Sequence, residues 1–268
     1  NNHNEYLMES GDKKYKSKDY KGAITDYSQI LIDNPNDLNA LFQRALAKSY
    51  LDDHEGAIKD YTRVIEINPE YASAFYNRGL SKDEMEDSYG AISDYSKAIA
   101  INGKHKNAFI YRGYAKSDIG DHEGAIKDLT SAIEIDPEDP FGYNGRGYVK
   151  EKAGDYYAAI SDYSKAIKID PENDYSYSGR AYAKWMIGDK NGATNDFTKA
   201  IQLNPDEAYA FFGRGVIHKS EGNFKQACED WIIASDMGYE IAKTRADECK
   251  NTDVVKESIL NLLSTQNY

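Results

Sequence analysis

The sequence predicts an all-α solenoid, in which similar pairs of helices follow one another along the chain. One observation is proline at a period of 34 residues or twice that number: Pro35, Pro69, Pro137, Pro171 and Pro205. A second is alanine at the same period without a gap: Ala23, Ala57, Ala91, Ala125, Ala159, Ala193 and Ala227. A third is the helical spacing of apolar residues in two segments of each unit. A fixed period of this size indicates supersecondary units that stack on their neighbours.

The first helix of each unit is expected at its first fourteen positions, counted so that Asn4 and Pro140 open the first and fifth units. Position four is large in Phe75, Phe109, Tyr143, Tyr177 and Phe211. Position eight is always small: Gly11, Ala45, Gly79, Gly113, Gly147, Ala181 and Gly215. A glycine inside a helix costs about 1 kcal/mol relative to alanine. Its repeated use at position eight therefore predicts that two helices approach closely there.

The second helix of each unit is expected to start after position sixteen and to end before the proline. Position sixteen holds residues whose short side chains cap free N–H groups: Asp19, Asp53, Asp87, Asp121, Asp155, Asp189 and Asn223. Position twenty-four is a large residue on the apolar face: Tyr61, Tyr95, Leu129, Tyr163, Phe197 or Trp231. Proline disfavours helix in the residue before it. Gly103 replaces the third proline, and we expect the helix to end at the same place with glycine as its cap.

This pattern resembles the tetratricopeptide repeat family. The residues that carry the resemblance are large at position four, small at eight and twenty, aromatic at twenty-four, usually alanine at twenty-seven and proline at thirty-two. The resemblance covers Asn4 to Ile241. It implies antiparallel helix pairs in a right-handed superhelix, whose first helices line a concave face that usually holds a peptide or a partner protein.

The resemblance divides the chain into a start, an array and a C-terminal segment. Residues 1–3 are expected to be disordered. The seven repeats are expected at 4–37, 38–71, 72–105, 106–139, 140–173, 174–207 and 208–241. Residues 242–268 are expected to form capping helices and a tail, with a last helix that starts at Asp253. The apolar stripe of that helix either covers the last repeat or forms a dimerisation or partner surface.

Three charged positions recur where the family usually has apolar or aromatic residues. Arginine at position seven and lysine at position eleven lie one helical turn apart and repel each other. Aspartate at position twenty-three of the facing helix is the available counter-charge. We therefore expect a structural charge ladder, which includes Arg78, Asp94, Arg112, Asp128, Arg146, Asp162, Arg180 and Asp196. Because exposed pairs contribute roughly 0–1 kcal/mol each, the ladder is expected to set register. The alternative is a row of arginines that binds an anionic ligand.

The concave groove implied by the resemblance is rich in aromatic residues. It uses positions two, five, six, nine and twelve, which here include Phe42, Tyr76, Tyr111, Tyr114, Phe141, Tyr148, Tyr175, Tyr182, Trp185, Tyr209 and Phe212. Gly145, Gly179 and Gly213 are expected to leave room for a ligand. Amphipathic aromatic side chains suit peptide recognition. The alternative for any one tyrosine is packing against the next repeat.

The best-known peptide-binding mode of the family is a clamp of lysines and asparagines around a C-terminal carboxylate. The matching positions here hold Phe42, Leu46, Tyr76, Asn77 and Leu80. This departure disfavours a receptor for Hsp70 or Hsp90 tails, and an extended or helical peptide fits better.

The sequence predicts a scaffold that binds a protein or a peptide, and no enzyme. The histidines do not cluster, and we find no phosphate-binding loop, nucleophile motif or metal spacing, so neither a cofactor nor a metal is expected. The net charge of −12 disfavours nucleic acid as a partner. No segment approaches the ~20 apolar residues of a membrane span. A self-assembling protein that stacks through the concave face or the C-terminal helix is the alternative, and an adaptor module of a longer chain is a third reading.

The two cysteines, Cys228 and Cys249, are expected to be reduced and partly buried, with a disulfide as the other possibility. No signal peptide is visible, and we expect a cytoplasmic location. Because the chain begins at Asn1 without methionine, a processed protein that is exported or periplasmic stays open.

Overall fold

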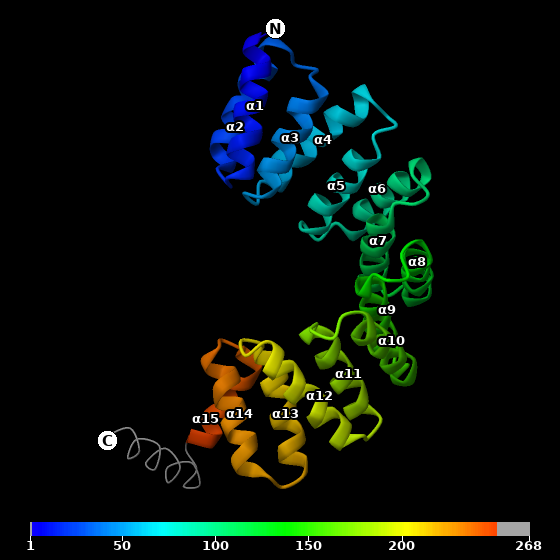
Figure 1. Ribbon diagram of the computed structural model, residues 1–268, viewed down its shortest axis with the longest axis vertical. Helices are drawn as coiled ribbons and strands as arrows, with labels where there is room; N and C mark the ends of the chain where they lie inside the picture. Colours follow the sequence, from blue (N-terminus) through cyan, green and yellow to red (C-terminus); the bar gives the residue numbers. More distant parts are fainter. Residues whose placement is uncertain (1, 251–268) are drawn as a thin grey trace, which may run out of the picture. The chain divides into compact units, whose positions relative to one another are not determined.

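The computed structural model describes residues 2–250, in which fifteen helices and no strand are found (Figure 1). Within each compact part of the chain consecutive helices contact each other, and the all-helical fold class is confirmed. The chain divides into two compact parts, each made of several repeats, at residues 1–136 and 137–268. We call these parts the first and the second unit from here on. The expected last helix from Asp253 lies outside the described residues.

The first unit consists of helix pairs in which each helix also contacts the first helix of the next pair. Its helices are α1 (Asn2–Lys16), α2 (Tyr20–Asp33), α3 (Leu38–Ser49), α4 (His54–Ile67), α5 (Ala72–Asp83), α6 (Ser88–Ile101), α7 (Lys106–Asp118) and α8 (His122–Ile135). Helix α1 already includes Asn2 and His3, where we expected a disordered start. No glycine or proline precedes Asn4 to end the helix, so it continues toward the N-terminus.

The second unit repeats this arrangement and adds a single helix at its end. Its helices are α9 (Pro140–Lys152), α10 (Tyr156–Ile169), α11 (Asp174–Met186), α12 (Lys190–Leu203), α13 (Ala208–Ser220), α14 (Phe224–Asp236) and α15 (Glu240–Lys250). Helix α15 packs against α14 and buries Ala242, Ala246 and Cys249. None of the described helices in either unit is long and apolar enough to cross a membrane.

The small residue at position eight accommodates the large residue at position twenty-four of the same pair. Tyr95 is fully buried, and a Cβ atom on Gly79 would lie 2.7 Å from Cε1 of its ring. A Cβ atom on Gly215 would lie 2.7 Å from Nε1 of Trp231. The predicted close approach of the two helices is confirmed, and its cause is the side chain that fills the space between them.

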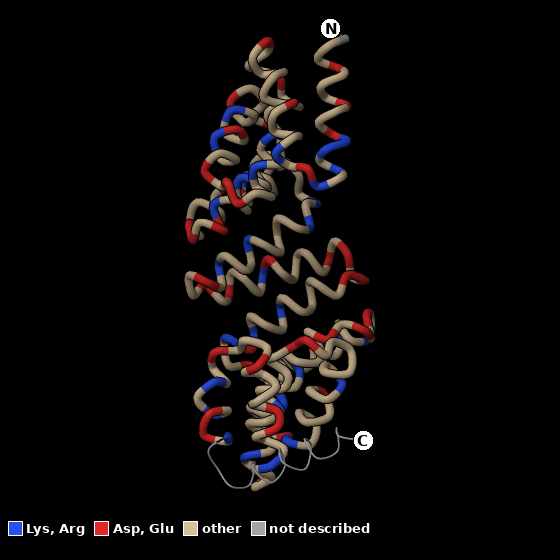
Figure 2. Tube along the Cα trace, turned by 90° about the vertical axis from the view of Figure 1, so that its left-hand side faces the viewer, with Lys and Arg blue, Asp and Glu red and all other residues tan. Residues whose placement is uncertain are grey.

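The second helices begin as the capping pattern predicts. Six aspartates accept a hydrogen bond from a backbone N–H three residues further on, at 2.9–3.1 Å: Asp19, Asp53, Asp87, Asp121, Asp155 and Asp189. Figure 2 shows acidic residues at many helix ends, where these caps lie. Asn223 makes no such bond, so the last pair departs from the prediction.

Gly103 does not act as the expected glycine cap. Helix α6 ends at Ile101, which matches the ends of α4 at Ile67 and α8 at Ile135, so its place was predicted correctly. The cap residue is Asn102, whose φ is −126°, and Gly103 does not have a positive φ. The glycines with positive φ lie instead in turns between helices, as at Gly154.

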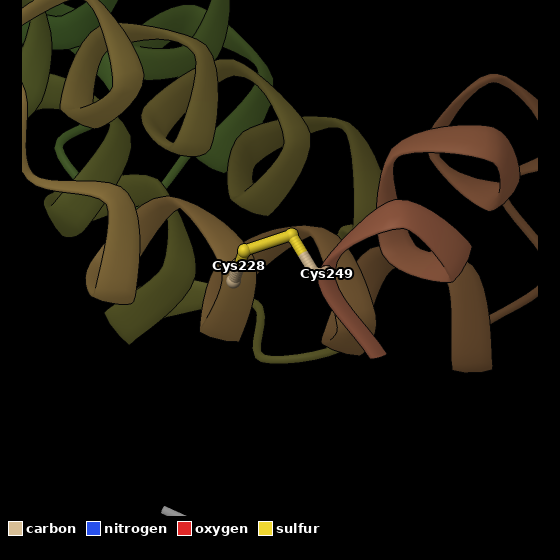
Figure 3. The surroundings of a disulfide bond; sticks show 2 residues. All are labelled: Cys228 and Cys249. Atoms are coloured by element: carbon tan, nitrogen blue, oxygen red, sulfur yellow. A yellow bond between two sulfur atoms is a disulfide. The ribbon is translucent and has the colours of Figure 1, made fainter. Parts of the chain in front are cut away.

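Cys228 and Cys249 form a disulfide bond, and the expectation of two reduced thiols is wrong (Figure 3). The bond joins α14 to α15, and the two Cα atoms are 5.5 Å apart. Helix α15 folds back against α14, which brings together two residues that are 21 positions apart in the sequence. The sequence alone could not place α15, so it could not decide between the two states.

Candidate partner-binding surface

The predicted groove residues differ in how far their side chains are exposed to solvent. Tyr111, Phe141 and Tyr175 are exposed, with Phe141 the most exposed at 64%. The remaining eight are partly buried: Phe42, Tyr76, Tyr114, Tyr148, Tyr182, Trp185, Tyr209 and Phe212. Positions two, five, six, nine and twelve of the first helices, which we call the first-helix surface, contribute to a pocket in each unit.

The pocket of the first unit has a volume of about 290 Å³ and lies among α3, α4, α5 and α7. Leu46, Leu80 and Tyr111 from the first-helix surface line it together with the buried Tyr61 of α4. The rings of Tyr111 and Tyr76 are 6.0 Å apart, and burial raises the pKa of Tyr76. This pocket therefore has an aromatic and aliphatic wall.

A carboxylate group with an unusual pKa lies near this wall. Burial, followed by the charges of Asp118 and Glu84, raises the pKa of Asp83 to about 6. Because Glu84 also lines the pocket, the aromatic surface of the first unit is accompanied by acidic groups.

The pocket of the second unit has a volume of about 380 Å³ and is lined by four tyrosines and two glutamates: Tyr148, Tyr163, Tyr175, Tyr209, Glu151 and Glu207. We call it the tyrosine–glutamate pocket. Three of its tyrosines were predicted as groove residues, and Tyr163 comes from the second helix α10.

Both glutamates of this pocket hold their proton more tightly than a glutamate in water does. Burial raises the pKa of Glu151 to about 7, although a hydrogen bond from the Tyr163 hydroxyl and the charge of Lys152 oppose the shift. Burial also raises the pKa of Glu207 to about 7. The hydroxyl of Ser178 donates a hydrogen bond of 2.8 Å to Glu207.

The glycines at position six do not leave space for a ligand, so that expectation is wrong at two of the three positions. A Cβ atom on Gly179 would lie 2.5 Å from Cζ of Tyr163, the large residue of the preceding helix pair. Phe197 occupies the corresponding space at Gly213. These glycines let a ring from the neighbouring pair reach the first-helix surface, and Tyr163 enters the tyrosine–glutamate pocket for this reason.

Several predicted groove residues contact other parts of the chain and line neither pocket. Phe212 lies against α15, where the Arg245 guanidinium carbon is 4.8 Å from the ring centroid. Lys190 Nζ is 5.8 Å from the ring centroid of Trp185. Phe42 packs against Tyr61 at a centroid distance of 5.7 Å. Packing within the array therefore uses part of the aromatic set.

The arginines of the charge ladder point to aspartate and do not face solvent. Arg78 donates two hydrogen bonds to Asp94, from Nε at 2.8 Å and from Nη2 at 2.7 Å, and Lys82 reaches the same carboxylate at 2.8 Å. The same pairing joins Arg112 to Asp128, Arg146 to Asp162 and Arg180 to Asp196. The side chain of Asp94 is only 4% exposed. Treating these pairs as exposed was therefore wrong, because the two helices of a pair cover the carboxylate.

Models of known families match four segments of the chain. Models described as tetratricopeptide repeat match residues 72–105, 109–139 and 140–173, and one described as TPR repeat matches residues 50–82. This chain belongs to the tetratricopeptide repeat family. The structure agrees, since its helices fit an array of such repeats. The search of curated proteins gave no match.

Solved structures of TPR proteins share this fold. A tetratricopeptide repeat protein from Parabacteroides merdae has a TM-score of 0.77 and 21% identity, with 94% of this chain and all of that chain covered. MamA has a TM-score of 0.59 and 25% identity, with 63% of this chain and 93% of that chain covered. YrrB, described as a TPR protein with an unusual peptide-binding site, has a TM-score of 0.56 and 20% identity over 69% of this chain and 95% of its own.

Two features of the TPR array were missed by the sequence reasoning. A hydroxyl at position twenty-five accepts a hydrogen bond from the arginine of the next repeat, as when Arg78 Nη1 donates to Thr62 at 3.0 Å. Its periodicity was available, because serine or threonine recurs at this position. The presence of Glu151 and Glu207 in one pocket had no such signal, since the two residues occupy different repeat positions.

TPR repeats generally serve as protein–protein interaction scaffolds, and the architecture of this chain supports that role. Among residues 2–250, no three histidine, cysteine, aspartate or glutamate side chains lie close enough to hold a metal ion together.

Proposed function

We propose that this chain is a non-enzymatic scaffold that holds an extended peptide, or a segment of a partner protein, against its first-helix surface. The observation that carries the proposal is that each unit has a pocket formed by this surface and lined by tyrosines. Concave sites with aromatic walls and a few polar groups are typical of ligand binding. Tyrosine also contributes strongly to protein interfaces, because one ring buries a large area and its hydroxyl can still form a hydrogen bond.

The exposed aromatic residues of this surface are the expected anchors. Tyr175 is 48% exposed and borders the pocket of the second unit, and Tyr111 borders the pocket of the first. Truncating a dominant interface residue typically costs about 2 kcal/mol or more in binding free energy. The YrrB structure, with its peptide-binding site, gives a precedent for peptide binding on this fold.

The test is a selection of random twelve-residue peptides on the purified chain, followed by affinity measurement for the enriched peptides. Tyr175→Ala and Tyr111→Ala are expected to weaken binding by about tenfold or more. Tyr157→Ala is the matched control, because Tyr157 is 74% exposed and lies on the second helix α10. Equal affinities for all three variants would contradict the proposal.

Self-assembly is the alternative function, and it predicts a different result. Sedimentation velocity over a hundredfold range of concentration is expected to show one species if the surface is free for a partner. A reversible dimer or polymer that is abolished by Tyr175→Ala would instead assign this surface to contacts between copies of the chain.

A further inference from the structure

Glu151 and Glu207 are partly buried, and they differ from the ladder aspartates, which are buried between the two helices of a repeat. The ladder aspartates each pair with an arginine, as Asp196 does with Arg180 at 2.8 Å. Glu151 accepts a hydrogen bond of 3.1 Å from Tyr163, and Glu207 accepts one of 2.8 Å from Ser178. Neither glutamate forms an ion pair with a lysine, arginine or histidine among residues 2–250. Two carboxylates at the wall of one pocket therefore have no ion-pair partner, although the charge of Lys152 also acts on Glu151.

The rest of the pocket wall consists of tyrosine rings. The faces of aromatic rings carry negative charge density and attract cations, with energies that rise from about 0.5–1 kcal/mol at exposed sites to about 2 kcal/mol when the cation is desolvated. Tyr148 already shows this attraction, because Lys152 Nζ lies 5.2 Å from its ring centroid. The carboxylates and the rings thus favour the same kind of ligand.

The electrostatic influence of Glu151 extends across the pocket. After burial, the charge of Glu151 is the next cause that raises the pKa of both Tyr163 and Tyr209. The three groups come from α9, α10 and α13, so three helices place negative charge and aromatic rings around one volume. That volume of about 380 Å³ lies within the range of roughly 300–1,000 Å³ for small-ligand pockets.

We propose that the tyrosine–glutamate pocket binds the cationic side chain of a lysine or an arginine presented by the bound segment. The ammonium or guanidinium group donates hydrogen bonds to Glu151 and Glu207, while its methylene groups pack against the tyrosine rings. The claim that a bound segment presents this side chain rests on the proposed function. The claim that the pocket binds cations does not rest on it, and small cations can test that claim without any partner.

The first experiment titrates n-butylammonium and methylguanidinium chloride, which mimic the two side chains, into the full chain labelled with ¹³C on its tyrosine rings. Tyr148→Phe and Tyr209→Phe serve to assign the signals. Both cations are expected to shift the signals of these tyrosines at concentrations where sodium chloride and 1-butanol do not. In E151Q/E207Q, binding is expected to weaken by at least about tenfold, because the charge-assisted hydrogen bonds are lost.

A charge-matched control separates this pocket from the overall acidity of the chain. Glu138 and Glu172 are exposed and lie in turns, so E138Q/E172Q removes the same charge and is expected to bind the cations as the wild type does. A second comparison uses Tyr209→Leu, which removes the aromatic ring, and Tyr209→Phe, which keeps it. Only Tyr209→Leu is expected to weaken binding of the cations. Equal binding to E151Q/E207Q and E138Q/E172Q, or no shift with either cation, would overturn the pocket assignment.

The second experiment asks where the cation comes from. Peptides selected on the wild type are expected to carry lysine or arginine at one fixed position, and selection on E151Q/E207Q is expected to lose that preference. Peptides without it would overturn this inference and leave the scaffold function intact, whereas failure to select any peptide would contradict the scaffold function. Tighter binding of tetramethylammonium than of butylammonium, without the peptide preference, would assign the pocket to a free quaternary amine and also overturn the proposal.

Discussion

Arg180 and Asp196 face each other across α11 and α12 and share two hydrogen bonds, each 2.8 Å long. The side chains are 18% and 8% exposed, respectively. Arg180 Nη1 also donates to the hydroxyl of Ser164 in the preceding repeat at 3.1 Å. One guanidinium group therefore connects the two helices of its own repeat and the second helix of its neighbour.

Asp196→Ala is expected to destabilise the fold by about 3–5 kcal/mol, because it leaves a buried guanidinium without its counter-charge. The measurement is the shift of the unfolding midpoint in urea, followed by circular dichroism. Glu66→Ala is the control, since Glu66 pairs with Arg63 at the surface and such pairs contribute about 0–1 kcal/mol. Similar small losses for the two variants would show that the ladder pair is no stronger than a surface pair.

Gly79→Ala is expected to destabilise the chain by about 1–3 kcal/mol, although alanine favours helix more than glycine does. The added Cβ atom would lie 2.7 Å from the ring of Tyr95, which is fully buried and cannot move aside easily. Gly103→Ala is the matched change, because no atom lies within 4 Å of the position of its Cβ. Thermal melts of both variants measure the difference, and a stabilised Gly79→Ala would contradict the packing argument.

Reduction of the Cys228–Cys249 bond is expected to loosen α15 and to cost about 3 kcal/mol, the value typical for a closed loop of this length. Hydrogen exchange of α15 with and without reductant measures the effect. C228S/C249S should exchange alike under both conditions, and an unchanged wild type would contradict the prediction. Disulfides persist in oxidising compartments and are rare in the cytosol. The disulfide thus does not support the predicted cytoplasmic location. That location stays a prediction, and cell fractionation can check it.

Glu151 is expected to make the stability of the chain depend on pH. Burial raises its pKa from an ordinary value of 4.5 to about 7 in the folded chain, although the hydrogen bond from Tyr163 and the charge of Lys152 oppose this rise. The folded state therefore binds the proton more tightly than the unfolded state does. This contribution to stability is fully present below pH 4.5 and is lost as the pH rises through about 7.

The comparison of wild type with Glu151→Gln isolates this contribution. The free energy of unfolding of the variant is expected to rise relative to that of the wild type between pH 5 and 8, since glutamine stays neutral. Urea unfolding at several pH values measures it. Glu172→Gln, which removes the same charge at an exposed position, is the matched control. A difference between wild type and Glu151→Gln that does not change with pH would contradict the assignment.

The sequence was sufficient for features that recur in every repeat. The spacing of sixteen residues between Arg78 and Asp94 identified ion-pair partners, and the small residue at Gly79 indicated the close approach of α5 and α6. The same residue types recur at the same positions in most repeats, so a departure in one repeat does not hide the pattern.

Features that occur at a single site in the array, and do not recur from repeat to repeat, could not be predicted in this way. The disulfide depends on the position of α15, and the tyrosine–glutamate pocket brings together Glu151 of α9 and Glu207, which precedes α13. The role of Gly179 was misjudged because its neighbour, the ring of Tyr163, belongs to the preceding repeat. Contacts between repeats with no period leave no pattern in a single sequence.

The hydrogen bonds from arginine to the preceding hydroxyl also distinguish the first and seventh repeats from the five between them. The first repeat has Ser10 at the arginine position, and Ser10 bonds Asp26 directly at 2.7 Å. The seventh repeat has Ile232 where the others have serine or threonine. The first repeat thus lacks the donor of this link, and the seventh repeat lacks the acceptor. Whole internal repeats can be gained or lost by duplication and deletion without orphaning a donor, and we expect the length of this scaffold to vary in evolution by such steps.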